Sequence, residues 1–108
     1  MRILFDQGTP VPIAAYFPEH TVRTTLQEGW DRLANGDLLL AAEAAGYQIL
    51  LTTDNNLGYQ QNLKSRKIAI VVINRNRWRL VQRMIRKIVI AVNTAEPGSY
   101  TLVEIPPR

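Results

Sequence analysis

The sequence predicts an α/β fold, a sandwich in which helices pack on a mostly parallel sheet. Short apolar segments rich in β-branched residues alternate with helix-forming segments, which is typical of parallel β-α units. The strongest apolar segment, residues 68–73, is uninterrupted, as expected of a strand buried on both faces. A chain of 108 residues is about the size of one domain, so residues 1–108 are predicted to form a single domain.

The first predicted elements are two strands separated by a short helix. Residues 2–6 are apolar up to Asp6 and are followed by turn-forming residues, which indicates a buried strand that leads into a loop. Two prolines then favour a short helix that extends to Tyr16. Residues 20–25 contain several β-branched side chains and predict a second, shorter strand.

The next elements are a loop, a helix and a strand. Residues 27–36 are polar and are predicted to form the loop. A helix is expected over residues 38–45, with Asp37 at or near its N-cap and Gly46 as its stop. Residues 47–52 then predict the third strand, directly before Thr53 and Asp54.

The second half of the chain is expected to add helices and two strands. A short helix is predicted over residues 57–63, before the strand at residues 68–73. Over residues 77–95, apolar side chains recur at offsets of three and four, which predicts one amphipathic helix. A last strand is expected at residues 100–105, before two consecutive prolines.

Composition excludes several classes of protein. Hydrophobic residues make up 46% of the chain and charged residues 20%, as in ordinary globular proteins, so a disordered chain is not expected. No apolar run is long enough for a membrane span, and Asp6 interrupts any signal-peptide pattern, so we expect a cytoplasmic protein without membrane contact. The absence of cysteine excludes disulfides and thiolate chemistry, and His20 is the only histidine. Any catalysis is therefore expected to rest on carboxylates.

Charge is distributed unevenly along the chain. Residues 1–54 contain three basic and seven acidic side chains, whereas residues 55–108 contain ten basic and two acidic ones. From Asn55 to Ala95 there is no acidic residue at all. A polyanionic partner is therefore expected for the second half of the chain.

Three aspartates are expected at one edge of the sheet. In parallel α/β sheets, ligands bind outside the carboxyl ends of the strands. Asp6 and Asp54 each follow a predicted strand, and Asp37 begins a helix on the same side. Three carboxylates in one cleft would repel one another unless a divalent cation such as Mg²⁺ or Mn²⁺ were bound, and such a site suits phosphodiester hydrolysis. Individually, each aspartate also fits a structural role in a cap, a turn or an ion pair.

Three acidic blocks of the sequence resemble a known family. They are Ile3-Leu-Phe-Asp6-Gln-Gly-Thr-Pro10, Asn35-Gly-Asp37-Leu-Leu and Ile49-Leu-Leu-Thr-Thr-Asp54-Asn-Asn-Leu57. Together they are similar to those of small PIN-like proteins, relatives of the PIN-domain ribonucleases that include toxins of bacterial toxin–antitoxin pairs. The resemblance implies a three-layer α/β/α fold and a Mg²⁺ or Mn²⁺ site formed by Asp6, Asp37 and Asp54. It also implies RNA as the substrate and an antitoxin protein as a partner, while a homodimer stays open.

The chain departs from this pattern at two positions. Many relatives have a glutamate after the first aspartate and a second aspartate in the third block, where this chain has Gln7 and Asn56. The side-chain oxygen of Asn56 is still a candidate metal ligand, but it contributes no charge. A catalytically silent RNA-binding or protein-interaction module is therefore the alternative function. A phosphatase or phosphoacceptor domain finds no support, because no second aspartate follows Asp6 closely and no lysine is suitably placed.

Arginines and one tryptophan follow the strongest predicted strand. Arg75, Arg77, Trp78 and Arg79 combine cations with an aromatic ring, which suits contact with phosphates and stacking on bases. They are therefore the candidate nucleic-acid-binding residues. The alternative is that Trp78 packs into the core and the arginines are solvated.

Overall fold

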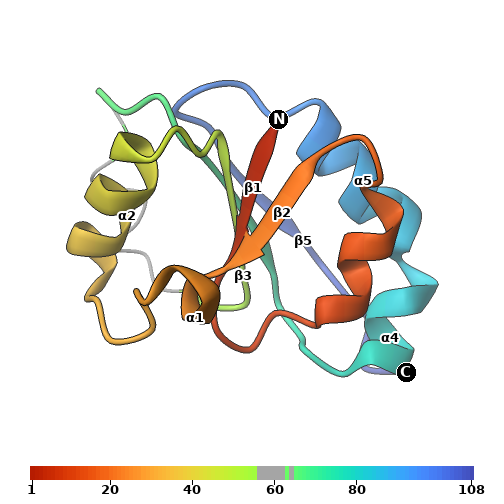
Figure 1. Cartoon of the computed structure of the whole chain (residues 1–108). Helices are drawn as coiled ribbons and strands as arrows, with labels where there is room; N and C mark the ends of the chain where they lie inside the picture. Colours follow the sequence, from red (N-terminus) through yellow and green to blue (C-terminus); the bar gives the residue numbers. More distant parts are fainter. Residues whose placement is uncertain (56–62, 64) are drawn as a thin grey trace.

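A five-stranded parallel sheet forms the centre of the protein (Figure 1). The computed structural model describes residues 1–55, 63 and 65–108. The strand order is β2-β1-β3-β4-β5, and all four neighbouring pairs are parallel. The strands are β1 (Arg2–Phe5), β2 (Thr21–Thr24), β3 (Ile49–Thr52), β4 (Ala69–Ile73) and β5 (Tyr100–Val103). The α/β class and each predicted strand are thus confirmed.

Helical segments connect these strands. They are the 3₁₀ helix η1 (Val11–Tyr16) and the α-helices α1 (Thr25–Glu28), α2 (Asn35–Ala44), α4 (Trp78–Arg83) and α5 (Ile85–Asn93). The predicted helix over residues 57–63 lies outside the described residues, apart from Leu63. Within the part of the chain that the structure describes, no helix has the length and apolar character to cross a membrane.

Each face of the sheet carries its own hydrophobic core. Successive strand side chains point to opposite faces, so Ile3 and Phe5 of β1 belong to one core and Leu4 belongs to the other. The first core includes residues of η1, α4 and α5, and the second includes residues of α2. Figure 1 shows α2 on one side of the strands and α4 and α5 on the other. All five residues of β4 are buried, in agreement with their uninterrupted apolar sequence.

The prediction of a single helix over residues 77–95 is wrong in one respect, because the structure contains two helices in this segment. They meet at Met84 (φ −109°, ψ 17°), which ends α4 and precedes α5. A straight helix of that length would be roughly 28 Å long, whereas a strand of five residues spans roughly 17 Å. Val81 of α4 and Ile88 of α5 are both completely buried in the same core.

The prediction of a loop over residues 27–36 is also wrong, because both ends of this segment are helical. Its start belongs to α1, which begins with a capping box between Thr24 and Gln27 and ends at Gly29 (φ 77°). Its end belongs to α2, whose N-cap is Ala34. Asp37 is therefore the third residue of α2, in the first turn, where its negative charge interacts favourably with the helix dipole.

Candidate functional site

The strand order reverses between β1 and β3. From β1 the chain passes to β2 on one side, and it later returns to β3 on the other side. Such a reversal opens a ligand-binding crevice at the carboxyl ends of the two strands. Asp6 directly follows β1, and Asp54 lies two residues beyond β3. The fold therefore brings these two predicted residues to the same crevice.

Hydrogen bonds fix the half-buried carboxylate of Asp6. Its Oδ1 accepts the backbone N–H of Gln7 at 2.8 Å, and its Oδ2 accepts the hydroxyl of Thr52 at 2.8 Å. The backbone N–H of Asp6 donates to the carbonyl of Leu51 at 2.9 Å, which continues the pairing of β1 with β3 beyond the last strand residue. Both carboxylate oxygens are thus held in a defined orientation.

Thr52 connects the two aspartates and was not a predicted site residue. Its side chain is completely buried at the end of β3. Besides donating to Asp6, its hydroxyl oxygen accepts the backbone N–H of Asp54 at 3.0 Å. One buried hydroxyl therefore couples the two acidic positions, and we call Asp6, Thr52 and Asp54 the acidic site. The threonine that ends the apolar strand just before Asp54 is the sequence signal for this role.

The loop after β1 packs tightly against the segment after β3. The buried hydroxyl of Thr9 donates to the carbonyl of Leu51 at 3.2 Å. Gly8 has a φ of 83°, and a Cβ added there would lie 3.2 Å from Oγ1 of Thr53. A glycine at this position therefore satisfies both the backbone conformation and the close approach. These contacts keep Asp6 beside the end of β3.

A second residue that the sequence did not indicate, Tyr100, lies near Asp54. Its hydroxyl donates to Oδ1 of Asn55 at 3.4 Å. Partial burial raises the pKa of Tyr100 above its ordinary value, and the negative charge of Asp54 raises it further. Because Tyr100 begins β5, its bond to Asn55 connects the segment after β3 with the last strand of the sheet.

Asp37 is not brought into this arrangement. Asp37 is exposed in the first turn of α2. Helix α2 begins at the end of the molecule where strand β1 ends (Figure 1). The side chain of Asp37 forms no hydrogen bond or ion pair with Asp6 or Asp54 among the described residues. Across residues 1–55, 63 and 65–108, no group of three His, Cys, Asp or Glu side chains is close enough to hold a metal ion. Asn56 lies outside the described residues.

The four predicted nucleic-acid-binding residues have different surroundings. Nε of Arg75 donates to the backbone carbonyl of Ile105 at 2.8 Å, so this arginine is bonded to the segment after β5. Trp78 is half-buried against the core, with its ring centroid 6.3 Å from that of Tyr16. Arg77 and Arg79 are exposed.

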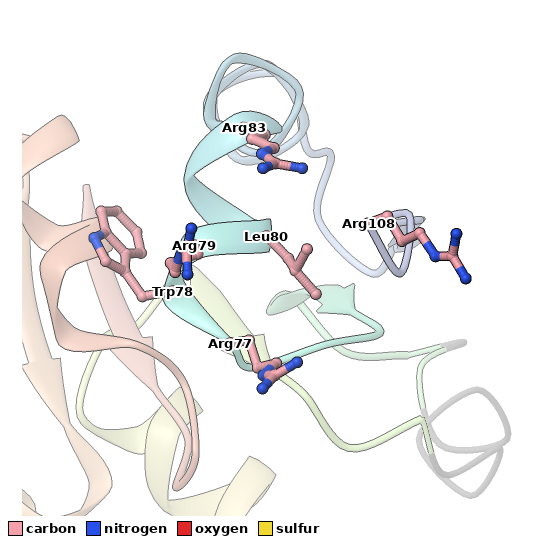
Figure 2. A pocket seen from close by; sticks show the side chains of 6 residues that line it. All are labelled: Arg77, Trp78, Arg79, Leu80, Arg83 and Arg108. Atoms are coloured by element: carbon pink, nitrogen blue, oxygen red, sulfur yellow. The ribbon is translucent and has the colours of Figure 1, made fainter.

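Arg77 and Arg79 line a groove on α4 together with two further arginines. The groove has a volume of about 450 Å³, and Figure 2 shows its residues. We call it the arginine groove, and its lining residues are Arg77, Trp78, Arg79, Leu80, Arg83 and Arg108. In Figure 2 the ring of Trp78 points away from Leu80, on the other side of α4. The lining of the groove therefore combines Leu80 with four arginines.

The acidic site has a donor set that suits a hard divalent cation. Mg²⁺ is bound by oxygen ligands and is often held by only one or two carboxylates, with water and substrate phosphates completing the coordination. The oxygens of Asp6 each accept one hydrogen bond and keep further lone pairs, and Asp54 is exposed. The residues present therefore fit such an ion. Comparisons of the chain with protein-family models, with curated proteins and with solved structures find no match.

Proposed function

We propose that the protein is a metal-dependent ribonuclease of PIN-like type, with a three-layer α/β/α fold. The observation that carries this proposal is the coupling of Asp6 and Asp54 through the buried hydroxyl of Thr52, in the crevice where the strand order reverses. Two carboxylates that follow neighbouring strands would repel each other if they faced the same ligand, and a bound cation would remove that repulsion. Asp6 and Asp54 would hold Mg²⁺ or Mn²⁺, with Asp37 on the same edge as a third acidic group.

The chain's own residues supply orientation and substrate binding. The cation, when bound, lowers the pKa of a water and polarises a phosphoryl oxygen, which is the chemistry that phosphodiester hydrolysis requires. Thr52 and the backbone N–H of Gln7 hold the Asp6 carboxylate in one orientation. Exposed arginines beside the same edge of the sheet, Arg77 and Arg79, are available for RNA phosphates. We further propose a cytoplasmic toxin whose partner is an antitoxin protein.

A catalytically silent RNA-binding module is the second candidate. It is favoured by the position of Asp37, which contacts neither Asp6 nor Asp54 among the described residues, and by the neutral side chain of Gln7. Such a module would keep the fold and the basic surface without hydrolysis. The two candidates differ in whether the acidic site binds a cation.

A manganese titration separates the two candidates. The thermal midpoint of unfolding of the ribonuclease should rise with Mn²⁺, and Asp6→Asn and Asp54→Asn should abolish both this rise and the cleavage of labelled single-stranded RNA. Without metal, each variant should be as stable as the parent or slightly more stable, because one repulsive charge is gone. Glu19→Gln is the matched control, since it removes an exposed carboxylate elsewhere. An unchanged midpoint at millimolar Mn²⁺ would identify the silent module.

A further inference from the structure

The arginine groove holds four guanidinium groups that have no partner among the described residues of the chain. Among the described residues, the side chains of Arg77, Arg79, Arg83 and Arg108 form no hydrogen bond or ion pair. No acidic residue lines the groove. Two arginines outside the groove, Arg23 and Arg66, each form an ion pair with a glutamate. The groove therefore concentrates positive charge that no described residue of the protein compensates.

Contacts within the fold position Arg108, the last of these arginines, beside α4. The segment after β5 is anchored at Ile105, which is 1% exposed. The backbone N–H of Ile105 donates to Oδ1 of Asn74 at 2.6 Å, and its carbonyl accepts Nε of Arg75 at 2.8 Å. Figure 2 shows Arg108 across the groove from Arg77 and Arg83, with Leu80 between them. Residues far apart in sequence are thus held on two sides of one depression.

The geometry suits several phosphates rather than one small anion. Guanidinium groups bind phosphate through two parallel hydrogen bonds, which makes arginine the preferred residue for this recognition. Arg77 and Arg83 are six residues apart, so they are separated by roughly 9 Å along the helix axis. That span exceeds a single phosphate, and four unpaired positive charges exceed what one phosphate neutralises. A polymer with regularly spaced phosphates fits both the length and the charge.

The groove and the acidic site share one edge of the sheet. Both follow the carboxyl ends of strands, since Asp6 follows β1 and Arg77 lies in the loop after β4. Only β3 separates β1 from β4, which places the two strand ends roughly 10 Å apart. A single extended strand of nucleic acid can therefore reach from one region to the other.

We infer that the arginine groove is a phosphate-backbone site for single-stranded RNA, formed jointly by α4 and the segment after β5. The choice of RNA rests on the proposed function, whereas the phosphate chemistry follows from the groove alone. The groove holds part of the substrate beside the acidic site and contributes to affinity without taking part in hydrolysis. Arg83 and Arg108 thereby join Arg77 and Arg79 as RNA-binding residues.

Binding measured without divalent cations tests this inference separately from catalysis. The probe is a labelled single-stranded oligoribonucleotide, titrated with the full chain in a chelator at several salt concentrations. In the triple variant Arg77→Gln, Arg83→Gln and Arg108→Gln, affinity should fall at least tenfold. The slope of log affinity against log salt should become shallower by about two, because roughly 0.7 counterions are released per phosphate contact with a single strand. The control Arg32→Gln with Arg86→Gln removes exposed charges outside the groove and should change affinity less than twofold.

Three results would overturn the inference. One is an unchanged affinity in the triple variant, and another is a loss per removed charge as large in the control as in the groove variant. The third is equal competition by poly-glutamate of matched charge, which would identify an acidic protein as the occupant. Circular dichroism should show that the glutamine variants are folded. If RNA binds in the groove but is never cleaved with Mn²⁺, the proposed ribonuclease fails while the groove assignment stands.

Discussion

The acidic site and the arginine groove are both charged regions at one edge of the sheet, but they are held in opposite ways. In the acidic site, the Asp6 carboxylate accepts two hydrogen bonds, and Thr52 ties it to the backbone of Asp54. In the arginine groove, the guanidinium groups extend from exposed positions and bond to no described residue of the chain. The acidic site is therefore held by hydrogen bonds within the fold, whereas the arginine side chains of the groove extend from the surface.

This difference predicts how each region responds to substitution. Removing the buried hydroxyl of Thr52 leaves both of its partners without that bond, so stability and function should fall together in this case. Removing an exposed unpaired charge should leave stability nearly unchanged and affect only binding. Substitutions in both regions can test whether loss of stability and loss of binding are separable in this way.

Trp78 is the strictest test of this difference, because it belongs to the groove but also packs on the core. Although it borders the arginine groove, its ring packs on the core and lies beside Tyr16. Trp78→Ala should therefore lower the free energy of unfolding by about 2 kcal/mol, less than for a fully buried tryptophan because the ring is only half-buried. Chemical denaturation measures the loss, and Trp78→Phe should recover part of it. Unchanged stability together with weaker RNA binding would instead assign the ring to base stacking.

Thr52→Val should damage the acidic site from within. Valine nearly preserves the shape but removes the hydroxyl, leaving Oδ2 of Asp6 and the N–H of Asp54 without that partner. We expect a loss of about 1 kcal/mol in the free energy of unfolding and at least a tenfold lower rate of RNA cleavage. Thr52→Ser, which keeps the hydroxyl, should retain most of the cleavage rate. Equal rates in the valine and serine variants would show that the hydroxyl does not position Asp6.

Two neighbouring arginines provide a closely matched comparison. Arg75 holds the carbonyl of Ile105, whereas Arg77 is exposed and unpaired among the described residues. Arg75→Gln should therefore lower the free energy of unfolding by about 1 kcal/mol, and Arg77→Gln should change it by less than about 0.5 kcal/mol. Denaturant titrations of both variants measure the difference. Similar losses in the two variants would contradict the division between structural and binding arginines.

Most of the fold could be predicted from the sequence because its signals are local. The apolar run of β4 and the β-branched residues of β2 define strands without reference to the rest of the chain. The break at Met84 could not be predicted, since the spacing of apolar residues continues through it.

The candidate site was predictable only in part, because several of its contacts join residues that are far apart in the sequence. A general rule for parallel sheets places Asp6 and Asp54 at one edge without any knowledge of side-chain contacts. The bond between Thr52 and Asp6 joins residues 46 positions apart, and the bond between Arg75 and Ile105 joins residues 30 positions apart. Such contacts depend on strand order and register, so the role of Thr52 and the position of Arg108 emerge only from the folded chain.

The smallest expected effect is a change in the titration of Tyr100. Its pKa is raised above the ordinary 10.0, first by burial and second by the charge of Asp54. Because the folded protein holds this proton more tightly than the unfolded chain, Tyr100 contributes stability that is complete below pH 10 and is lost as the pH rises through the raised value. Asp54→Asn removes only the second cause, so the pKa of Tyr100 should fall part of the way back. Ultraviolet difference spectra of the phenolate measure this shift, with Tyr100→Phe to assign the signal and Glu19→Gln as the control. An unshifted titration in Asp54→Asn would mean that the carboxylate of Asp54 lies too far from β5 to be felt there.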